Sequence, residues 1–223
     1  MLVLDAQNSR RTLPAVNGPL RERSAYNRYV PHVIEPASSS RAKCRGCGRP
    51  IAKGELRFGE RQPNAFGEGE MTLWFHLTCA AYARPEPFLE VASTAGDHQG
   101  GRESRASQEQ LPADAAAALI PAARFGIEHR RVPRIHGAER APTSRARCRS
   151  CKELIAKDEW RIALVFFEEF RFEPGGFVHA GCAQPYFETI DIVDRILHFA
   201  PDLGAADIAG LTKALRAARA PTG

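Results

Sequence analysis

Long apolar runs are missing from this sequence of 223 residues. No stretch approaches the roughly 18 apolar residues that a membrane-spanning helix needs. The first residues hold only the short apolar trio Leu2-Val3-Leu4, which is too little for the hydrophobic region of a signal peptide. We therefore expect a soluble, non-secreted protein that has no membrane partner.

Cysteine is scarce as well, and every cysteine lies in a repeated spacing. A Cys-x-x-Cys pair is followed by a His-x-x-Cys pair, with 28 residues between the pairs in the first copy and 27 in the second. Three thiolates and one imidazole are a standard tetrahedral set for structural zinc, and a two-residue spacer lets one turn present two ligands. The pattern predicts two zinc ions per chain. The ligands are Cys44, Cys47, His76 and Cys79, and then Cys148, Cys151, His179 and Cys182.

Other uses of these cysteines fit the pattern less well. Three cysteines per copy would leave one unpaired thiol in a disulfide scheme. A redox Cys-x-x-Cys normally opens a helix after a buried strand, whereas here it follows a basic segment twice. A zinc deaminase has the order His-x-Glu before Cys-x-x-Cys, and here Thr78 takes the place of the glutamate. Since four protein ligands leave no position open for water, we expect no metal catalysis.

The two copies define the organisation of the chain. The segment around Ser40-Arg41-Ala42 recurs at Ser144-Arg145-Ala146 with an offset of 104 residues, so we expect two structural units of one kind. The polar, glycine-containing stretch before residue 111 is typical of a linker. The predicted divisions are an arm at 1–25, a first unit at 26–90, a linker at 91–110, a helical tail at 111–128 and a second unit at 129–223.

Hydrophobic spacing predicts an α+β fold in each unit. Strands are expected just after each Cys-x-x-Cys pair, at 55–58 and 160–167. An alanine-rich helix is expected over 112–124, with Pro121 ending or kinking it. Two further helices are expected, around 190–197 and over 205–219. Each unit should therefore be a short antiparallel sheet with a few helices.

Positive charge gathers on the first half of each zinc pattern. Residues 41–57 carry a net charge of +5 and residues 145–161 a net charge of +3, so the remainder of the chain is net negative although the whole chain is +5. A basic patch on a rigid zinc turn can neutralise phosphates. A solvated basic face is the plainer alternative. The candidates for phosphate contact are Arg41, Lys43, Arg45 and Arg57, and then Arg145, Arg147, Arg149 and Arg161.

Apolar residues in loop-like context lie between the strands and the histidines. Phe66 and Met71 in the first unit, and Phe170 and Phe172 in the second, are candidates to stack on exposed base faces. A small core contact is the alternative. That alternative is preferred for the aromatic residues that flank strands or ligands, namely Trp74, Phe75, Phe166 and Phe177.

Each unit resembles the zinc finger of DNA-damage-type poly(ADP-ribose) polymerases and of a eukaryotic DNA ligase. The resemblance rests on Arg-Ala-x-Cys-x-x-Cys, a following strand arginine and an aromatic residue shortly before His-x-x-Cys, as in Trp-x-His-x-x-Cys. It implies recognition of nicks and ends without sequence preference. By that resemblance Arg41, Arg145, Arg57 and Arg161 contact the backbone, while the four loop residues stack on the terminal base pair.

The sequence thus favours a non-catalytic binder of DNA strand breaks that takes no small-molecule substrate. Only 41 residues follow Cys182, which is too few for a polymerase or ligase domain. A zinc-scaffolded adaptor between proteins of DNA repair is the alternative function, and repair proteins are further candidate partners. The expected location is the cytoplasm, with the nucleoid, in a bacterium and the nucleus in a eukaryote.

Overall fold

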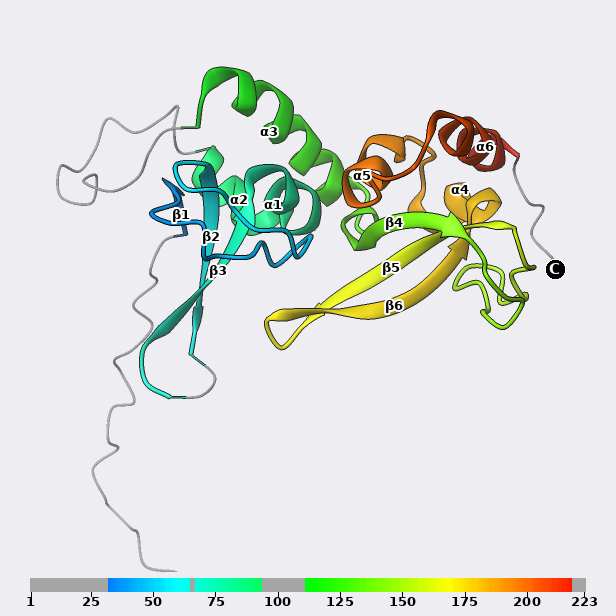
Figure 1. Cartoon of the computed structure of the whole chain (residues 1–223), viewed down its shortest axis with the longest axis horizontal. Helices are drawn as coiled ribbons and strands as arrows, with labels where there is room; N and C mark the ends of the chain where they lie inside the picture. Colours follow the sequence, from blue (N-terminus) through cyan, green and yellow to red (C-terminus); the bar gives the residue numbers. More distant parts are fainter. Residues whose placement is uncertain (1–31, 65–66, 94–110, 218–223) are drawn as a thin grey trace, which may run out of the picture. The chain divides into compact units, whose positions relative to one another are not determined.

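The computed structural model describes residues 32–64, 67–93 and 111–217. The fold is α+β, as predicted: two three-stranded antiparallel sheets, each followed by helices (Figure 1). The predicted arm and nearly all of the predicted linker lie outside the described residues. The described residues group as one compact unit.

The first sheet has the strand order β1-β2-β3, and α1, α2 and α3 follow it in the chain. We call this part the first finger. Its core forms around the fully buried side chains of Phe58, Phe75 and Phe88. Leu119 and Ala123 of α3 belong to the same core, so α3 packs on the first finger. The elements are β1 Val33–Pro36, β2 Leu56–Pro63, β3 Glu70–His76, α1 Leu77–Ala83, α2 Pro85–Ala92 and α3 Ala113–Glu128.

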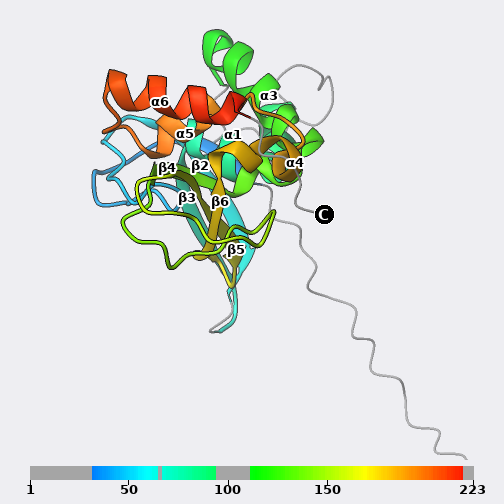
Figure 2. The same ribbon diagram turned by 90° about the vertical axis from the view of Figure 1, so that its right-hand side faces the viewer.

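The second sheet repeats this arrangement with the order β4-β5-β6, and we call it and its helices the second finger. Helices α4, α5 and α6 lie on one side of the sheet (Figure 2). The elements are η1 Val132–Arg134, β4 Ile135–Arg140, β5 Trp160–Glu168, β6 Arg171–His179, η2 Ala180–Cys182, α4 Ala183–Phe187, α5 Val193–Phe199 and α6 Ala205–Arg216.

The helix expected over 112–124 extends further than predicted. Helix α3 continues to Glu128, and Pro121 lies inside it and does not end it. Pro121 and Ala117, four residues earlier, are both exposed, so water can reach the carbonyl that the missing proline N–H would have bonded. Burial of Leu119 and Ala123 on the opposite side offsets the lost hydrogen bond.

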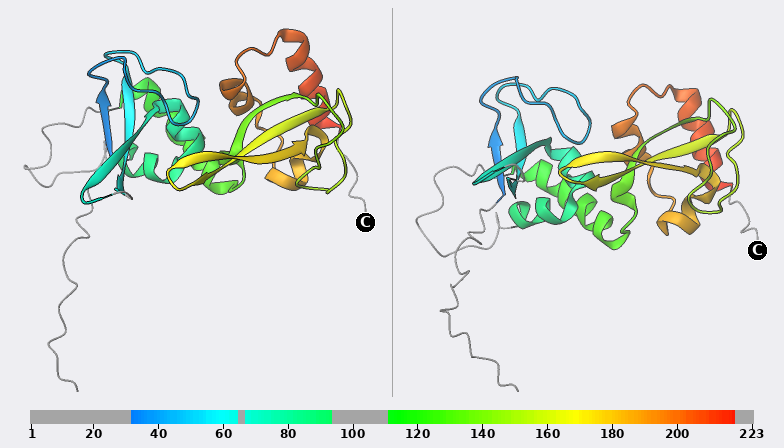
Figure 3. Two further views of the ribbon diagram at one scale, coloured as in Figure 1. Left: turned by 60° about the horizontal axis from the view of Figure 1, so that its bottom comes forward. Right: turned by 90° about the horizontal axis from the view of Figure 1, so that it is seen from below.

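Strands β5 and β6 form a long hairpin that extends beyond β4 (Figure 3). Its two turn residues, Glu169 and Phe170, have φ of 47° and 65°. Two successive residues with positive φ match the twist of a tight hairpin, although a bulky side chain rarely adopts this conformation. Phe167, Phe170 and Phe172 at this end are partly buried and pack against the core of the first finger.

Candidate metal centres and nucleic-acid interface

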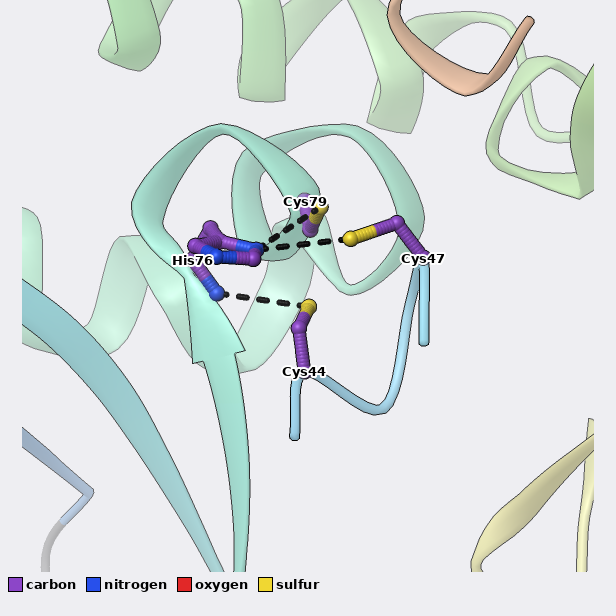
Figure 4. Close-up of side chains that lie close together, drawn as sticks. All are labelled: Cys44, Cys47, His76 and Cys79. Atoms are coloured by element: carbon purple, nitrogen blue, oxygen red, sulfur yellow. Dashed lines mark hydrogen bonds between the residues drawn. The ribbon is translucent and has the colours of Figure 1, made fainter. Parts of the chain in front are cut away.

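The first predicted ligand set converges on one point (Figure 4). One ligand atom from each of Cys44, Cys47, His76 and Cys79 can be chosen so that all four lie within 4.8 Å of one another. The Nδ1 atom of His76 lies 3.4 Å from the sulfur of Cys47 and 3.8 Å from that of Cys79. A tetrahedral zinc site has sulfur–nitrogen edges of about 3.6 Å. The four side chains therefore fit a zinc ion.

A tight turn presents the first two sulfurs. The amide of Cys44 donates to the carbonyl of Arg49, and the amide of Gly48 donates back to the carbonyl of Cys44, each at 2.8 Å. Gly48 has φ of 72°, which glycine adopts without strain. In the second finger Lys152 occupies the corresponding position with φ of 67°. The far ligands come from the end of β3 and the start of α1, so the sheet and the helix fix the second half of the site.

The second ligand set repeats this geometry. Cys148, Cys151, His179 and Cys182 also fit within 4.8 Å of one another. The Nδ1 atom of His179 lies 3.4 Å from the sulfur of Cys151 and 3.8 Å from that of Cys182. Equal distances in two separate sets indicate one kind of metal site formed twice.

The other ring nitrogen of each histidine, Nε2, lies within hydrogen-bond distance of a backbone carbonyl. Nε2 of His76 lies 3.2 Å from the carbonyl oxygen of Pro50, and Nε2 of His179 lies 3.3 Å from that of Leu154. A carbonyl can only accept a hydrogen bond, so Nε2 carries the proton and Nδ1 faces the sulfurs. This arrangement directs the unprotonated Nδ1 toward the metal position, as in other protein zinc sites.

The pKa values of the cysteine thiols favour a bound cation at each set. The hydrogen bond with Cys44, then burial and the neighbouring sulfur charges raise the pKa of Cys79. In the second set, burial first and then the charge of Cys148 raise the pKa of Cys182 to about 12. Three thiolates so close together repel one another, and a divalent ion removes that penalty. Together with the ligand geometry, this chemistry defines a protein with two Cys₃His zinc centres, one in each finger.

Comparison with known proteins shows which zinc finger family this chain is similar to. Residues 35–99 match the family model of the poly(ADP-ribose) polymerase and DNA-ligase zinc-finger region. A poly [ADP-ribose] polymerase of Sarcophaga peregrina is 30% identical over an alignment of 148 residues that covers 62% of this chain and 14% of the relative. The polynucleotide 3′-phosphatase ZDP of Arabidopsis thaliana is 28% identical over an alignment of 188 residues that covers 75% of this chain and 26% of the relative.

The first finger of this chain is a PARP-type zinc finger. The chain spans a small part of the curated relatives it matches, 14% of the polymerase and 26% of the phosphatase. The family model covers the zinc centre of the first finger and helices α1 and α2, while the second finger carries the same ligand set on the same sheet order. A zinc ion at each centre would hold the Cys-x-x-Cys turn to the sheet and its following helix, which is a structural role.

The basic residues of the zinc turns are on the surface. In the first finger, Arg41, Lys43 and Arg45 are exposed and line a hollow of about 550 Å³. Trp74 and Thr72 of β3 line the same hollow. Trp74, expected to make a core contact, is partly buried and packs against the first core. The corresponding residues of the second finger, Arg145, Arg147 and Arg149, are exposed too.

The strand arginine of the first finger is held differently. Arg57 is 7% exposed, its Nη2 donates to Glu35 at 2.6 Å, and its guanidinium lies 3.5 Å from the ring centre of Trp74. Glu35, Arg57 and Trp74 thus form a stack of carboxylate, guanidinium and aromatic ring.

The second finger has the same stack. Arg161 is 7% exposed, its Nε donates to Glu139 at 3.0 Å, and its guanidinium lies 3.6 Å from the ring centre of Phe177. The sequence motifs did not point to either glutamate, although Glu35 and Glu139 are 104 residues apart, which is also the offset between the two zinc turns.

The four residues proposed for base stacking lie in different settings. Phe66 lies outside the described residues. Met71 is partly buried on β3 and packs against the first core. Phe170 and Phe172 pack against that core from the β5–β6 hairpin, and the Phe172 ring lies 6.3 Å from the ring of Phe75 in an edge-to-face arrangement.

Proposed function

We propose that this chain binds DNA at strand breaks, independently of sequence, and acts by binding rather than by catalysis. The observation that carries the proposal is the hollow beside the first zinc turn. Its rim holds the three cations of Arg41, Lys43 and Arg45, and Trp74 contributes an aromatic ring. Cations that neutralise phosphate release counterions, and an aromatic ring accepts a sugar or base face.

The rigidity of the zinc turn supports this function. The turn is closed by backbone hydrogen bonds at Cys44 and Gly48, so its cations need little ordering when they meet a nucleic acid. Phosphate contacts of this kind supply affinity without reading sequence. Four protein ligands at each zinc centre leave no position for substrate, which supports a structural rather than catalytic metal.

Arg57 and Arg161 have a second part in this proposal. Each guanidinium is already oriented by a glutamate and an aromatic ring, so only a small edge of it reaches the surface. We assign these two arginines to short-range contacts with the backbone at the break. The exposed arginines and lysine provide the longer-range attraction.

Preference for a break over an intact duplex requires stacking on a free base-pair face. The proposal assigns this role to Phe66 and Met71 in the first finger, and to Phe170 and Phe172 in the second. For the second pair, stacking on DNA requires that the hairpin end leave its contacts with the first core, such as that between Phe172 and Phe75.

The test compares binding of the full chain to nicked, gapped, blunt-ended and circular intact duplexes over a range of salt. Arg41→Ala should lower the salt dependence of log K by about one unit and weaken binding to all forms alike. Arg216→Ala is the control, because Arg216 is exposed on α6, far along the chain from the zinc turns. Equal affinity for nicked and circular DNA would refute break recognition. An unchanged salt slope in Arg41→Ala and Arg145→Ala would favour the adaptor function, and DNA repair proteins would then be the partners to test.

A further inference from the structure

Helix α5 of the second finger presents two polar side chains, Arg195 and His198, three residues apart. Residues at this spacing lie on one face of a helix. Both side chains contact residues of the first finger, which lie on α1 and α3. The contacts of this face are therefore made across more than 70 residues of sequence.

Arg195 binds the carbonyl end of the zinc-bearing helix α1. The residue is 4% exposed, and its Nη1 donates to the carbonyl of Tyr82 at 2.7 Å. Its Nη2 donates to the carbonyl of Ala122 on α3, and its guanidinium lies 4.5 Å from the ring centre of Tyr82. The last carbonyls of a helix have no partner within it and carry partial negative charge, so a cation stabilises this end.

His198 reaches a zinc ligand. Its Nε2 lies 3.0 Å from the sulfur of Cys79, and its ring contacts the ring of Tyr82 edge to face at 5.3 Å. Three thiolates and one neutral histidine around a divalent ion leave a net negative charge. A donor to a thiolate offsets that charge and holds the ligand in its orientation.

With His198, every sulfur of the first centre has a donor. The backbone amide of His76 donates to Cys44 at 3.4 Å, and Nε of Arg49 donates to Cys47 at 3.3 Å. A zinc-bound Cys79 thiolate can only accept a hydrogen bond, so Nε2 of His198 on the second finger is its donor. Among the described residues, Cys182, the counterpart of Cys79, accepts no hydrogen bond from the first finger.

We propose that Arg195 and His198 form an internal docking surface whose partner is α1 of the first finger, and that this docking strengthens retention of the first zinc ion. The surface is chemically matched to its partner: a cation meets helix carbonyls, and an N–H donor meets a thiolate. Coupling of this kind is reciprocal, so loss of the first zinc ion also weakens the docking of α5. The proposal does not depend on DNA binding.

The test uses two variants of the full chain loaded with metal. His198→Phe keeps an aromatic ring against Tyr82 but removes the donor to Cys79. Arg195→Met removes the contacts to the helix carbonyls without touching a zinc ligand. The matched control is His129→Phe, because the His129 ring packs at a tilt against Phe125 with ring centres 4.5 Å apart and contacts no zinc ligand within the described residues.

Each zinc centre is measured separately. Cadmium NMR of the substituted protein gives one signal for each Cys₃His centre, and His76→Cys, which turns the first centre into four cysteines, identifies its signal. Chelator titration followed through the two signals then gives the metal affinity of each centre. Circular dichroism before titration establishes that each variant is folded.

We expect His198→Phe to shift the signal of the first centre and to lower its affinity about 10-fold, the low end for loss of a ligand's hydrogen-bond partner. Arg195→Met should lower the first affinity less and leave the signal position nearly unchanged. The second centre and the control should keep their affinities. Equal affinities of the first centre in wild type and both variants would overturn the proposal. Equal losses at both centres would also overturn it, because they would mean general destabilisation rather than docking on α1.

Discussion

In the stack of Glu35, Arg57 and Trp74, removal of the glutamate and removal of the arginine should lower the free energy of unfolding by different amounts. The Arg57 side chain is 9% exposed and that of Glu35 is 31% exposed. In addition, Nε of Arg57 is buried without a hydrogen-bond partner among the described residues. If the glutamate is removed, a buried guanidinium loses its one carboxylate. If the arginine is removed, the carboxylate can turn to water.

The two substitutions should therefore differ in cost. For Glu35→Ala we expect a loss of about 2–3 kcal/mol in the free energy of unfolding, the range for a hydrogen bond to a charged, largely buried group. For Arg57→Met the loss should be about 1 kcal/mol, because the thioether still packs on Trp74 and replaces part of the cation–π contact. The difference corresponds to at least a roughly fivefold change in the folding equilibrium.

Urea unfolding at saturating zinc measures both values. The sequence has two tryptophans, Trp74 in the first finger and Trp160 in the second, so Trp160→Phe leaves Trp74 as the fluorescence reporter of the first finger. The second finger gives a repeat of the test, since Glu139→Ala should cost more than Arg161→Met. A larger loss for Arg57→Met than for Glu35→Ala would refute the reasoning, because the carboxylate would then be the group that needs the pair.

Three further predictions concern metal content, pH and packing. Metal analysis should give two zinc ions per chain, and chelation should unfold both fingers; clearly fewer than two ions in fully loaded protein would contradict the ligand assignment. Because the pKa of Cys182 is raised to about 12 without metal, the thiol is protonated at neutral pH. Zinc binding must then release its proton, so affinity rises with pH, and calorimetry in two buffers of different ionisation enthalpy should detect the release; no release would contradict the shift. Gly59→Ala should destabilise the first finger by at least about 2 kcal/mol by overpacking, since a Cβ there would lie 2.6 Å from Cζ3 of Trp74 and 2.9 Å from Cγ2 of Val33. Gly48→Ala, with open space around it and φ of 72°, should cost only about 1 kcal/mol; similar urea midpoints for the two variants would show that the sheet yields.

The zinc centres were predictable because ligand spacing is a local property. Two residues between Cys44 and Cys47 allow only a tight turn, and the same spacing with the same chemistry occurs twice. The strand that follows each turn was also predictable, since β2 begins one residue after the expected start at residue 55 and β5 begins at the expected residue 160. The extension of α3 through Pro121 was not predictable, because it depends on which side of the helix the first core covers.

Contacts between distant segments were beyond the reach of the sequence. The spacing of Phe170 and Phe172 does not distinguish an exposed ring that can stack on a base from a ring that packs on another part of the chain. The same holds for His198, which has no metal-binding neighbour in the sequence and whose partner lies 119 residues away. The glutamates of the two stacks are a different case. Their repeat can be seen in the sequence, but their pairing with Arg57 and Arg161 becomes visible only from the register of the strands.

Helix α3 has a consequence for how the chain tolerates insertions. Ala123 lies in the core of the first finger, whereas Phe125, two residues later, packs against the core of the second. Gly126 then lies so close to Arg195 that an added Cβ would be 3.1 Å from its Nη2. One residue inserted between Ala123 and Phe125 would turn all later positions of the helix by about 100°. Such an insertion would keep the helix and both zinc centres, yet it would turn Phe125 and Gly126 away from the side chains they contact. The number of residues between Ala123 and Phe125 therefore fixes the rotation at which α3 meets the two cores.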